Sequence, residues 1–285
     1  MKFNFNLRNL FLNILVLIAA FIIVFPICWI FLMSLKSSAQ VMEWPPIFIF
    51  EPTLDNYKVL FDISVAGSSN YGTIRINFFE PILNSIIISG GAVIVSLIIG
   101  IPAGYILARS NFKFKEDIGF FILGFRFAPL ILVIIPMFYF FTKLGIKDTY
   151  FGMIWVYQVI TLPMIIWLTR VYVEDIPIEL EEAAFVDGAN VLQVIYKIIL
   201  PLLRPGLVGA SLLVFLLAWH NFALGLLLAS KKAPVTVALL KLLNPGINFY
   251  PVMACGLVIS MIVPILLIFL GQKHFIKGLT FGAVK

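Results

Sequence analysis

The chain has 285 residues, of which 62% are hydrophobic and 12% charged, and its formal net charge is +6. Soluble domains are about 45–50% apolar and about 25% charged, so this composition excludes a soluble globular enzyme, a disordered chain and a disulfide-knit secreted domain. The two cysteines, Cys28 and Cys255, lie far apart in apolar stretches and suggest neither a disulfide framework nor a metal site. The excess of Lys and Arg fits the flanks of membrane segments better than nucleic-acid binding, since no basic and aromatic residues interleave as base stacking requires.

Six segments are long and apolar enough to cross a bilayer, which takes about 20 residues. In chain order they are residues 10–33, 82–108, 118–142, 149–169, 205–230 and 251–272. Arg126, in the third segment, is the only charged residue within them. Charges are sorted out of segments in this way when the solvent is lipid. The sequence therefore predicts an all-α polytopic membrane protein, with one transmembrane domain over residues 1–285.

The predicted orientation follows from the number of spans and the flanking charges. An even number of spans places both termini on one face of the membrane. Lys and Arg are somewhat more frequent on the face that carries the N-terminus, which favours cytoplasmic termini. The longest loop, residues 34–81, is then external, the loop 170–204 is cytoplasmic, and the loop 231–250 is external.

The sequence lacks the residues that several classes of membrane protein need for their chemistry. No Asp or Glu lies inside a predicted span, which disfavours proton-coupled carriers and aspartyl proteases. The chain has no His-Glu-x-x-His pattern for zinc and no Gly-x-x-x-x-Gly-Lys loop for nucleotide phosphates. We therefore expect neither a catalytic site nor a bound metal or cofactor, and we disfavour a membrane enzyme or an ion-coupled carrier.

Polar residues within the spans are candidates for a solute pathway. Arg126 either reaches the cytoplasmic interface or pairs with carbonyl groups or a partner subunit near such a pathway. The other candidates are Tyr157 and Gln158 in the fourth span and Trp219, His220 and Asn221 in the middle of the fifth. They supply hydrogen-bond groups and aromatic plates of the kind that bind a polar solute such as a sugar. Ordinary packing of a helix bundle is the alternative interpretation.

The segment before the fifth span predicts a helical hairpin. Glutamates at 179, 181 and 182 suit the first turn of a helix, which the pair Asp187-Gly188 ends. Asn190 then caps a second helix with Gln193 as its capping-box partner, and we expect Pro201 and Pro205 to end it. The second helix is too apolar to be left in water, so we expect it to dock on another protein. The alternative is a helix lying on lipid, which the acidic residues at its leading end disfavour because they would face anionic headgroups.

The same hairpin resembles the EAA loop of ABC importer permeases. The resemblance is carried by Glu182-Ala183-Ala184, Gly188, and Ile198-x-Leu200-Pro201. Three further stretches are similar to the carbohydrate-importing, maltose-type branch: residues 103–109 (Ala-Gly-Tyr-x-x-Ala-Arg), residues 126–129 and the tail 278–285. One position departs: the branch usually has Trp-Asn-Glu-Phe where this chain has Trp219-His220-Asn221-Phe222. That departure weakens any solute-binding role carried over to these two polar positions.

The resemblance implies a type I ABC importer permease fold, with six transmembrane helices and a cytoplasmic coupling-helix loop at about 174–204. It implies a transport subunit in a prokaryotic inner or plasma membrane, not an enzyme, importing a mono-, di- or oligosaccharide; the alternative solute is a polyol or a sugar phosphate such as a glycerol phosphate. The implied partners are a second homologous permease, two ATPase subunits that carry the ATP and Mg, and an external solute-binding protein, which residues 244–250 would reach.

The resemblance also assigns roles to individual residues. Contacts with the ATPase are expected from Glu182, Ala183, Ala184, Asp187, Gly188, Ile198, Leu200 and Pro201, and from the tail residues Gly278, Gly282 and Lys285. Glu182 is expected to face an Arg of the ATPase cleft as a charge-assisted contact. In the maltose-type arrangement the partner permease holds most solute contacts.

Overall fold

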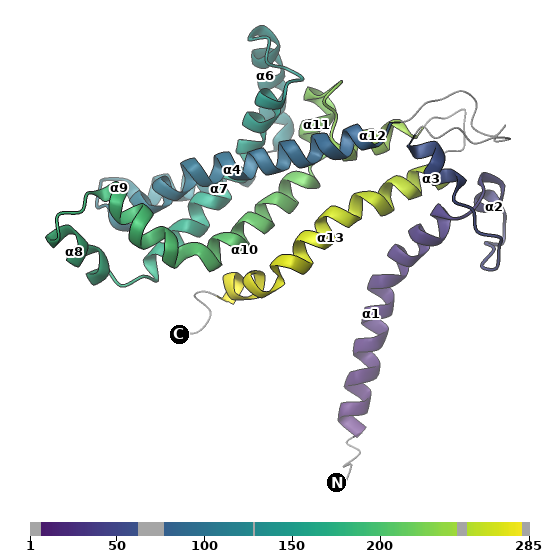
Figure 1. Cartoon of the computed structure of the whole chain (residues 1–285), viewed down its shortest axis with the longest axis horizontal. Coiled ribbons are helices and arrows are strands. Elements are labelled where there is room, and N and C mark those ends of the chain that lie inside the picture. Colours follow the sequence, from purple (N-terminus) through teal and green to yellow (C-terminus); the bar gives the residue numbers. More distant parts are fainter. Residues whose placement is uncertain (1–6, 62–76, 128, 244–249, 281–285) are drawn as a thin grey trace. The chain divides into compact units, whose positions relative to one another are not determined.

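The computed structural model describes residues 7–61, 77–127, 129–243 and 250–280, with residues 7, 9, 131 and 273–280 as backbone only. Every regular element in these ranges is a helix (Figure 1). Five of the described helices are long and apolar enough to cross a membrane, and there are six crossings if one bent pair counts as a single span. The prediction of an all-α membrane protein is confirmed.

The long helices follow the order of the predicted spans. They are α1 (Leu7–Ser34), α4 (Phe79–Arg109), α5 (Lys115–Gly124) with α6 (Leu130–Lys143), α7 (Tyr150–Glu174), α10 (Leu200–Trp219) with α11 (Ala223–Leu228), and α13 (Tyr250–Thr280). Short helices complete the described chain: α2 (Ser38–Met42), α3 (Asp55–Leu60), α8 (Glu179–Val186), α9 (Val191–Val194) and α12 (Val235–Lys241).

The chain divides into two compact units. The first takes its described residues from 1–78 and 239–261, and the second from 79–238 and 262–285. The prediction that residues 1–285 form one transmembrane domain stays a prediction.

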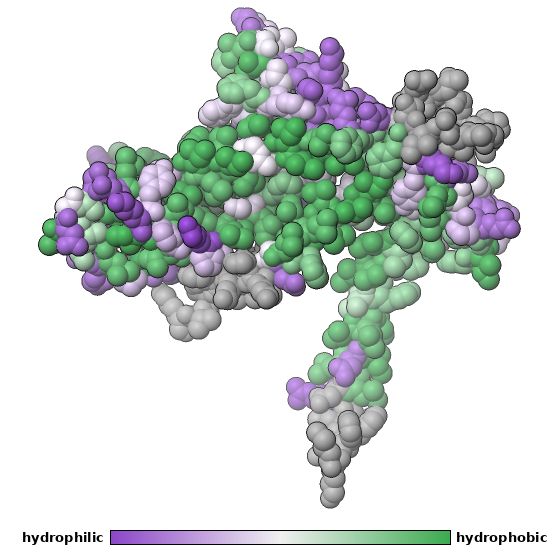
Figure 2. Space-filling view, in the orientation of Figure 1, coloured by the Kyte–Doolittle hydropathy of each residue, from purple (hydrophilic) through white to green (hydrophobic). Residues whose placement is uncertain are grey.

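The second unit is built on the close packing of α4 and α7. A Cβ atom added at Gly104 of α4 would lie 2.7 Å from the backbone oxygen of Ile166 in α7. Only glycine permits this approach, and small residues at helix contacts serve the same purpose in other membrane bundles. Helix α10 packs on both α4 and α7. Figure 2 shows hydrophobic surface along these helices, as a lipid-facing bundle requires.

Polar side chains bond α4 to α7 inside this contact. The hydroxyl oxygen of Ser96 lies within hydrogen-bond distance of Gln158 Oε1 (2.7 Å) and Thr161 Oγ1 (2.8 Å), and its single proton bonds one of them at a time. The amide of Gln158 donates to the backbone oxygens of Ala92 and Ile154. Ser96, Gln158 and Thr161 are all buried. Gln158 thus has a packing role in this structure, which was one of the two interpretations of its position.

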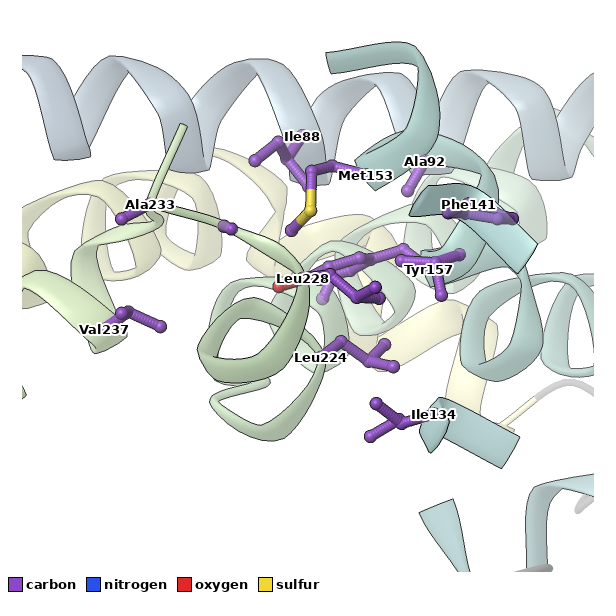
Figure 3. Close-up of a cluster of buried hydrophobic side chains, with 13 residues drawn as sticks. Ile88, Ala92, Ile134, Phe141, Met153, Tyr157, Leu224, Leu228, Ala233 and Val237 are labelled. Carbon is purple, nitrogen blue, oxygen red and sulfur yellow. The ribbon is translucent and has the colours of Figure 1, made fainter. Parts of the chain in front are cut away.

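A second buried cluster joins α4 and α7 to α6 and α11. In Figure 3, Leu224 and Leu228 of α11 lie between Ile134 of α6 and Met153 of α7. Tyr157 belongs to the same cluster and is almost fully buried. The short helix α11 is therefore an integral part of the core of this unit.

The fifth predicted span is broken, which corrects the prediction of an uninterrupted segment over 205–230. Helix α10 ends at Trp219, and α11 begins at Ala223. The side chain of Asn221 accepts a hydrogen bond from the backbone N–H of Leu224 (3.0 Å), and its backbone oxygen accepts one from the hydroxyl of Tyr157 (3.2 Å). A short amide side chain that bonds nearby backbone competes with helix continuation. The cluster at 219–221 thus lies at a helix break and not within a helix.

The third predicted span is bent. Helix α5 continues into a 3-10 turn, Phe125–Phe127, and then α6 follows at 88° to the first half of the pair. Residue 128 lies outside the described residues. Pro129, at the start of α6, disfavours a straight continuation of the helix here, because it lacks a backbone N–H.

The second helix of the hairpin is not ended by its prolines, contrary to the prediction. Val191–Trp219 is one continuous candidate span, with Pro201 and Pro205 inside α10. The preceding residues, Ile195–Ile199, form a π-helical turn. Such a turn changes the hydrogen-bond spacing by one residue, which lets a helix accommodate a missing N–H.

In the first unit, the chain after α1 folds back on the end of that helix. The buried ammonium of Lys36 donates to the backbone oxygen of Ile47 and lies 5.0 Å from the ring centroids of Trp29 and Phe50. The side-chain amide of Asn56, also buried, donates to the backbone oxygens of Ser34 and Lys36. These contacts hold the segment that follows the first span against the end of α1.

A single carboxylate holds the turn between α6 and α7 to the segment after α11. The side chain of Asp148 accepts three hydrogen bonds, of 2.8–2.9 Å, from the backbone N–H groups of Ser230, Lys231 and Lys232. Partial burial opposes ionisation, but these bonds and the charge of Lys231 outweigh it, so the pKa of Asp148 lies below its ordinary value.

Asp148 therefore makes stability depend on pH. Because its pKa is lower in the folded protein, its contribution is complete above about pH 5 and is lost as the pH falls through the folded pKa. We expect Asp148→Ala to lower the free energy of unfolding by about 1–2 kcal/mol at pH 7. Asp148→Asn tolerates the same left-handed backbone (φ +60°), and its melting temperature should fall less than that of the wild type between pH 6 and pH 3. The melting temperatures of the wild type and of Asp148→Asn are measured in detergent at each pH. An equal fall in melting temperature for both proteins would contradict this role.

Candidate functional site

The hairpin between α7 and α10 is built around a glycine turn. Gly188 has φ +83°, a left-handed conformation. Its N–H donates to the oxygen of Phe185 (3.0 Å), and the N–H of Ala189 donates to the oxygen of Ala184 (2.9 Å). This pair of bonds is the Schellman motif, which closes a helix on a left-handed residue. The predicted end of the first hairpin helix at Asp187-Gly188 is confirmed.

The start of the second hairpin helix is also as predicted. The side chain of Asn190 accepts from the N–H of Gln193, and the side chain of Gln193 accepts from the N–H of Asn190, each at 2.9 Å. This is a complete capping box. Two motifs on consecutive residues thus fix the direction in which the chain reverses.

One face of the hairpin belongs to the core of the second unit. Ala184 of α8 and Val194 of α9 are buried in a cluster with Tyr105 of α4 and Tyr172 of α7. Figure 1 places α8 and α9 at one end of the bundle formed by α4, α7 and α10. The hairpin therefore packs on the ends of α4 and α7, and the position of these helix ends determines the position of the hairpin.

The other face of the hairpin is exposed and mixes acid with apolar groups. Glu182, Ala183 and Asp187 are all exposed. Val186 is 87% exposed and Leu192 61%. Of the remaining coupling residues, Gly188 and Pro201 are exposed, Ala184 is buried, and Ile198 and Leu200 are half-buried. The structure thus places the EAA residues on one hairpin, with Glu182 and Ala183 on its exposed face and Ala184 on its buried face. Their roles in contact with the ATPase stay predictions.

Glu181, next to Glu182, has the opposite environment, which sequence reasoning missed. Its side chain is 2% exposed. One carboxylate oxygen accepts a 2.7 Å hydrogen bond from the hydroxyl of Tyr105, and the other accepts one of 2.7 Å from Nε of Arg109. Both partners lie near the end of α4, over 70 residues earlier in the chain. The local sequence, with glutamates at 179, 181 and 182, does not indicate which of them faces inward.

A second, more exposed charge cluster lies at the end of α7. Arg170 pairs with Glu174 on its own helix (2.8 Å) and with Glu116 on α5 (2.7 Å). The bond to Glu116 holds the start of α5 against α7.

The candidate solute-pathway residues do not form one cluster. Arg126, half-buried in the 3-10 turn, has its Nη1 2.8 Å from the sulfur of Met164. Trp219 is buried and stacks on Phe215, while His220 is exposed, with Nδ1 2.8 Å from the backbone oxygen of Leu216. Tyr157 and Asn221 meet at the helix break described above. Their role in solute passage stays a prediction.

The tail and one loop fall partly outside the described residues. Gly278 lies in α13, in the part described as backbone, whereas Gly282 and Lys285 lie beyond the described residues. Residues 244–249, expected to reach a binding protein, lie outside them as well. Within the described ranges, no three His, Cys, Asp or Glu side chains are grouped so as to hold a metal ion.

Known proteins resemble this chain along almost its whole length. The family model described as binding-protein-dependent transport system inner membrane component matches residues 100–281. The trehalose/maltose transport system permease protein MalG of Thermococcus litoralis is 32% identical over 284 residues, which cover 98% of each chain. The arabinooligosaccharides transport system permease protein AraQ of Halalkalibacterium halodurans is 32% identical over 93% of this chain and 92% of its own.

Solved structures of ABC transporters also resemble this chain. A bacterial ABC transporter involved in the import of the acidic polysaccharide alginate matches with a TM-score of 0.75 and 25% identity, over 96% of this chain and 99% of the other. The same fold recurs, with a TM-score of 0.58 and 22% identity, in the MetNI methionine ABC transporter, over 70% of this chain and 95% of that one.

The geometry of the turn predicts a specific cost for a side chain at position 188. A Cβ atom there would meet nothing within 4 Å, so only the left-handed backbone opposes it. We expect Gly188→Ala to lower the free energy of unfolding by about 1–2 kcal/mol. The control is Gly90→Ala in α4, which also has open space but lies in a helix, where alanine is neutral or favourable. Equal melting temperatures for the two variants in detergent would contradict the role of the turn.

Proposed function

The chain belongs to the family of binding-protein-dependent transport system inner membrane components, and we propose that it is the permease subunit of an ATP-driven importer of a saccharide. The relatives described above are transport permeases whose names refer to trehalose and maltose, to arabino-oligosaccharides and to alginate import. These names favour a mono-, di- or oligosaccharide over the alternative of a polyol or a glycerol phosphate.

The observation that carries the proposal is the two-sided hairpin. Its buried face is fixed to α4 and α7, and its exposed face presents Val186 and Leu192 beside the carboxylates of Glu182 and Asp187. Apolar groups next to acids suit a protein cleft that carries an Arg, where charge-assisted hydrogen bonds form. They suit an anionic membrane surface poorly, because the carboxylates would be repelled.

We infer the rest of the assembly from this docking role. Two ATPase subunits bind the ATP and Mg and hydrolyse the nucleotide, and one of them receives this hairpin. A second, homologous permease completes the membrane part. An external solute-binding protein delivers the saccharide; one structural neighbour is a bacterial alginate ABC transporter in complex with a periplasmic protein that holds an alginate pentasaccharide. Both termini and the hairpin then lie in the cytoplasm.

The helix break at residues 220–222 is the best-supported part of a solute pathway. Irregular backbone within a membrane occurs where protein buries it or where it lines a water-filled cavity. Transporters place such breaks beside their substrate sites. The exposed ring of His220 follows the buried Trp219 at this point, so we propose that polar solute passes close to His220 and Asn221.

The complete transporter tests this function. The chain is co-expressed with the second permease and the ATPase, reconstituted in vesicles, and supplied with the binding protein. Trehalose, maltose or an arabino-oligosaccharide is expected to stimulate ATP hydrolysis and to enter the vesicles. Stimulation by glycerol 3-phosphate alone would overturn the saccharide assignment, and ATP hydrolysis by the purified chain alone would overturn its role as a transport subunit.

Reversal of the charge at position 182 tests the docking face. We expect Glu182→Arg to reach the membrane in normal amount but to lower uptake by about tenfold or more, because the charge-assisted contact becomes a repulsion. Pull-down of the ATPase should weaken in parallel. The control is Glu179→Arg, at the start of the same helix and also exposed. Unchanged uptake and pull-down in Glu182→Arg would count against the docking role.

A further inference from the structure

We propose that Glu181 is a positioning residue that joins α8 to the end of α4, so that the docked hairpin and α4 move as one rigid body during transport. The proposal rests on the proposed function, since it concerns how movement of the hairpin reaches the membrane helices. Docking is a property of the exposed face, whereas this joint lies on the buried face.

The carboxylate of Glu181 is fully engaged. Tyr105 donates to one oxygen and Arg109 to the other, and the same Arg109 also donates through Nη2 to the backbone oxygen of Ile176, in the linker before α8. Three points are thereby fixed: the last turns of α4, the linker and the first turn of α8. A single bond would act as a pivot, whereas bonds at several points resist rotation.

Burial makes this joint stiff. The side chains of Glu181 and Arg109 are 2% and 15% exposed, so displacement of either would leave a charge unpaired away from water. The pairs of Arg170 provide a contrast, because Glu116 is 73% exposed and water replaces that partner at little cost. An apolar contact at the same place would hold the elements together but would let them slide, since it fixes no direction.

The reconstituted transporter, with all of its subunits, provides the test. The variants are Glu181→Gln and Arg109→Gln, and the control is Glu179→Gln, which removes the same charge from an exposed position on the same helix. We expect the two test variants to assemble with the ATPase and to hydrolyse ATP, but to transport at least about tenfold less solute per ATP, a loss within the usual range of coupling between sites. The control should stay within about twofold of the wild type.

The ratio of solute to ATP separates a joint from a merely structural group. Loss of structure reduces the amount of assembled transporter but leaves the ratio of the remaining molecules unchanged. A wild-type ratio in assembled Glu181→Gln and Arg109→Gln overturns the proposal. If neither variant assembles, Tyr105→Phe decides, because it removes one hydroxyl and keeps the ring in its cluster: a fall in the ratio supports the joint, and a wild-type ratio overturns it.

A distance measurement tests rigidity directly. Spin labels are placed on cysteines at Ile106 of α4 and Glu179 of α8, both exposed, in a chain in which Cys28 and Cys255 are replaced. We expect one narrow distance that is the same with and without ATP in the wild-type transporter and a broader distribution in Glu181→Gln. A wild-type distance that changes with ATP overturns the proposal. A failure of the proposed function itself is distinguishable, because the wild-type complex would then neither form with the ATPase nor transport a saccharide.

Discussion

Within a bilayer, no water is available to bond an open N–H or C=O group, and this constraint explains where the chain departs from regular helix. At the fifth span, the side chain of Asn221 accepts a hydrogen bond from the N–H of Leu224 in the first turn of α11, and the hydroxyl of Tyr157 donates to the backbone oxygen of Asn221. Before Pro201, which lacks a backbone N–H, the π turn Ile195–Ile199 changes the hydrogen-bond spacing of the helix. Between α4 and α7, Ser96 lies 2.7 Å from Gln158 Oε1, and the amide of Gln158 donates to backbone oxygens of Ala92 and Ile154. At the break in the fifth span, the bonding partners thus lie within three residues along the chain or on the packed neighbour α7.

Local sequence was sufficient to predict the hairpin turn. Gly188 follows an apolar helix end, and Asn190 and Gln193 have capping-box spacing, so both motifs depend only on residues adjacent in the chain. The long apolar spans were predictable for a similar reason, since bilayer thickness fixes the length of a crossing. The prolines were misleading because helices in a packed membrane bundle tolerate proline: Pro102 and Pro163 also lie inside α4 and α7.

The roles of neighbouring glutamates were not predictable from local pattern. Glu181 and Glu182 are the same residue type in the same helix, and only the contacts of Glu181 with the distant Arg109 and Tyr105 distinguish them. Gln158 raises the same difficulty: its partner Ser96 lies on another helix, so a polar residue in a span fits a solute pathway and an interhelical bond equally well until the packing is known. Long-range contacts decide both cases, and a single sequence does not contain them in readable form.

The arrangement of α7 connects the two parts of the proposed mechanism. Near one end, Tyr172 packs in the cluster that holds the hairpin, and nearer the other, Tyr157 bonds the helix break. These residues are about 22 Å apart along the helix, at about 1.5 Å per residue. Between them, Thr161 bonds α7 to Ser96 of α4, whose own end carries the partners of Glu181. Two helices packed and bonded in this way transmit displacement as a pair. On the proposed mechanism, movement of the docked hairpin therefore reaches the break at Asn221 without any rearrangement of side chains in between.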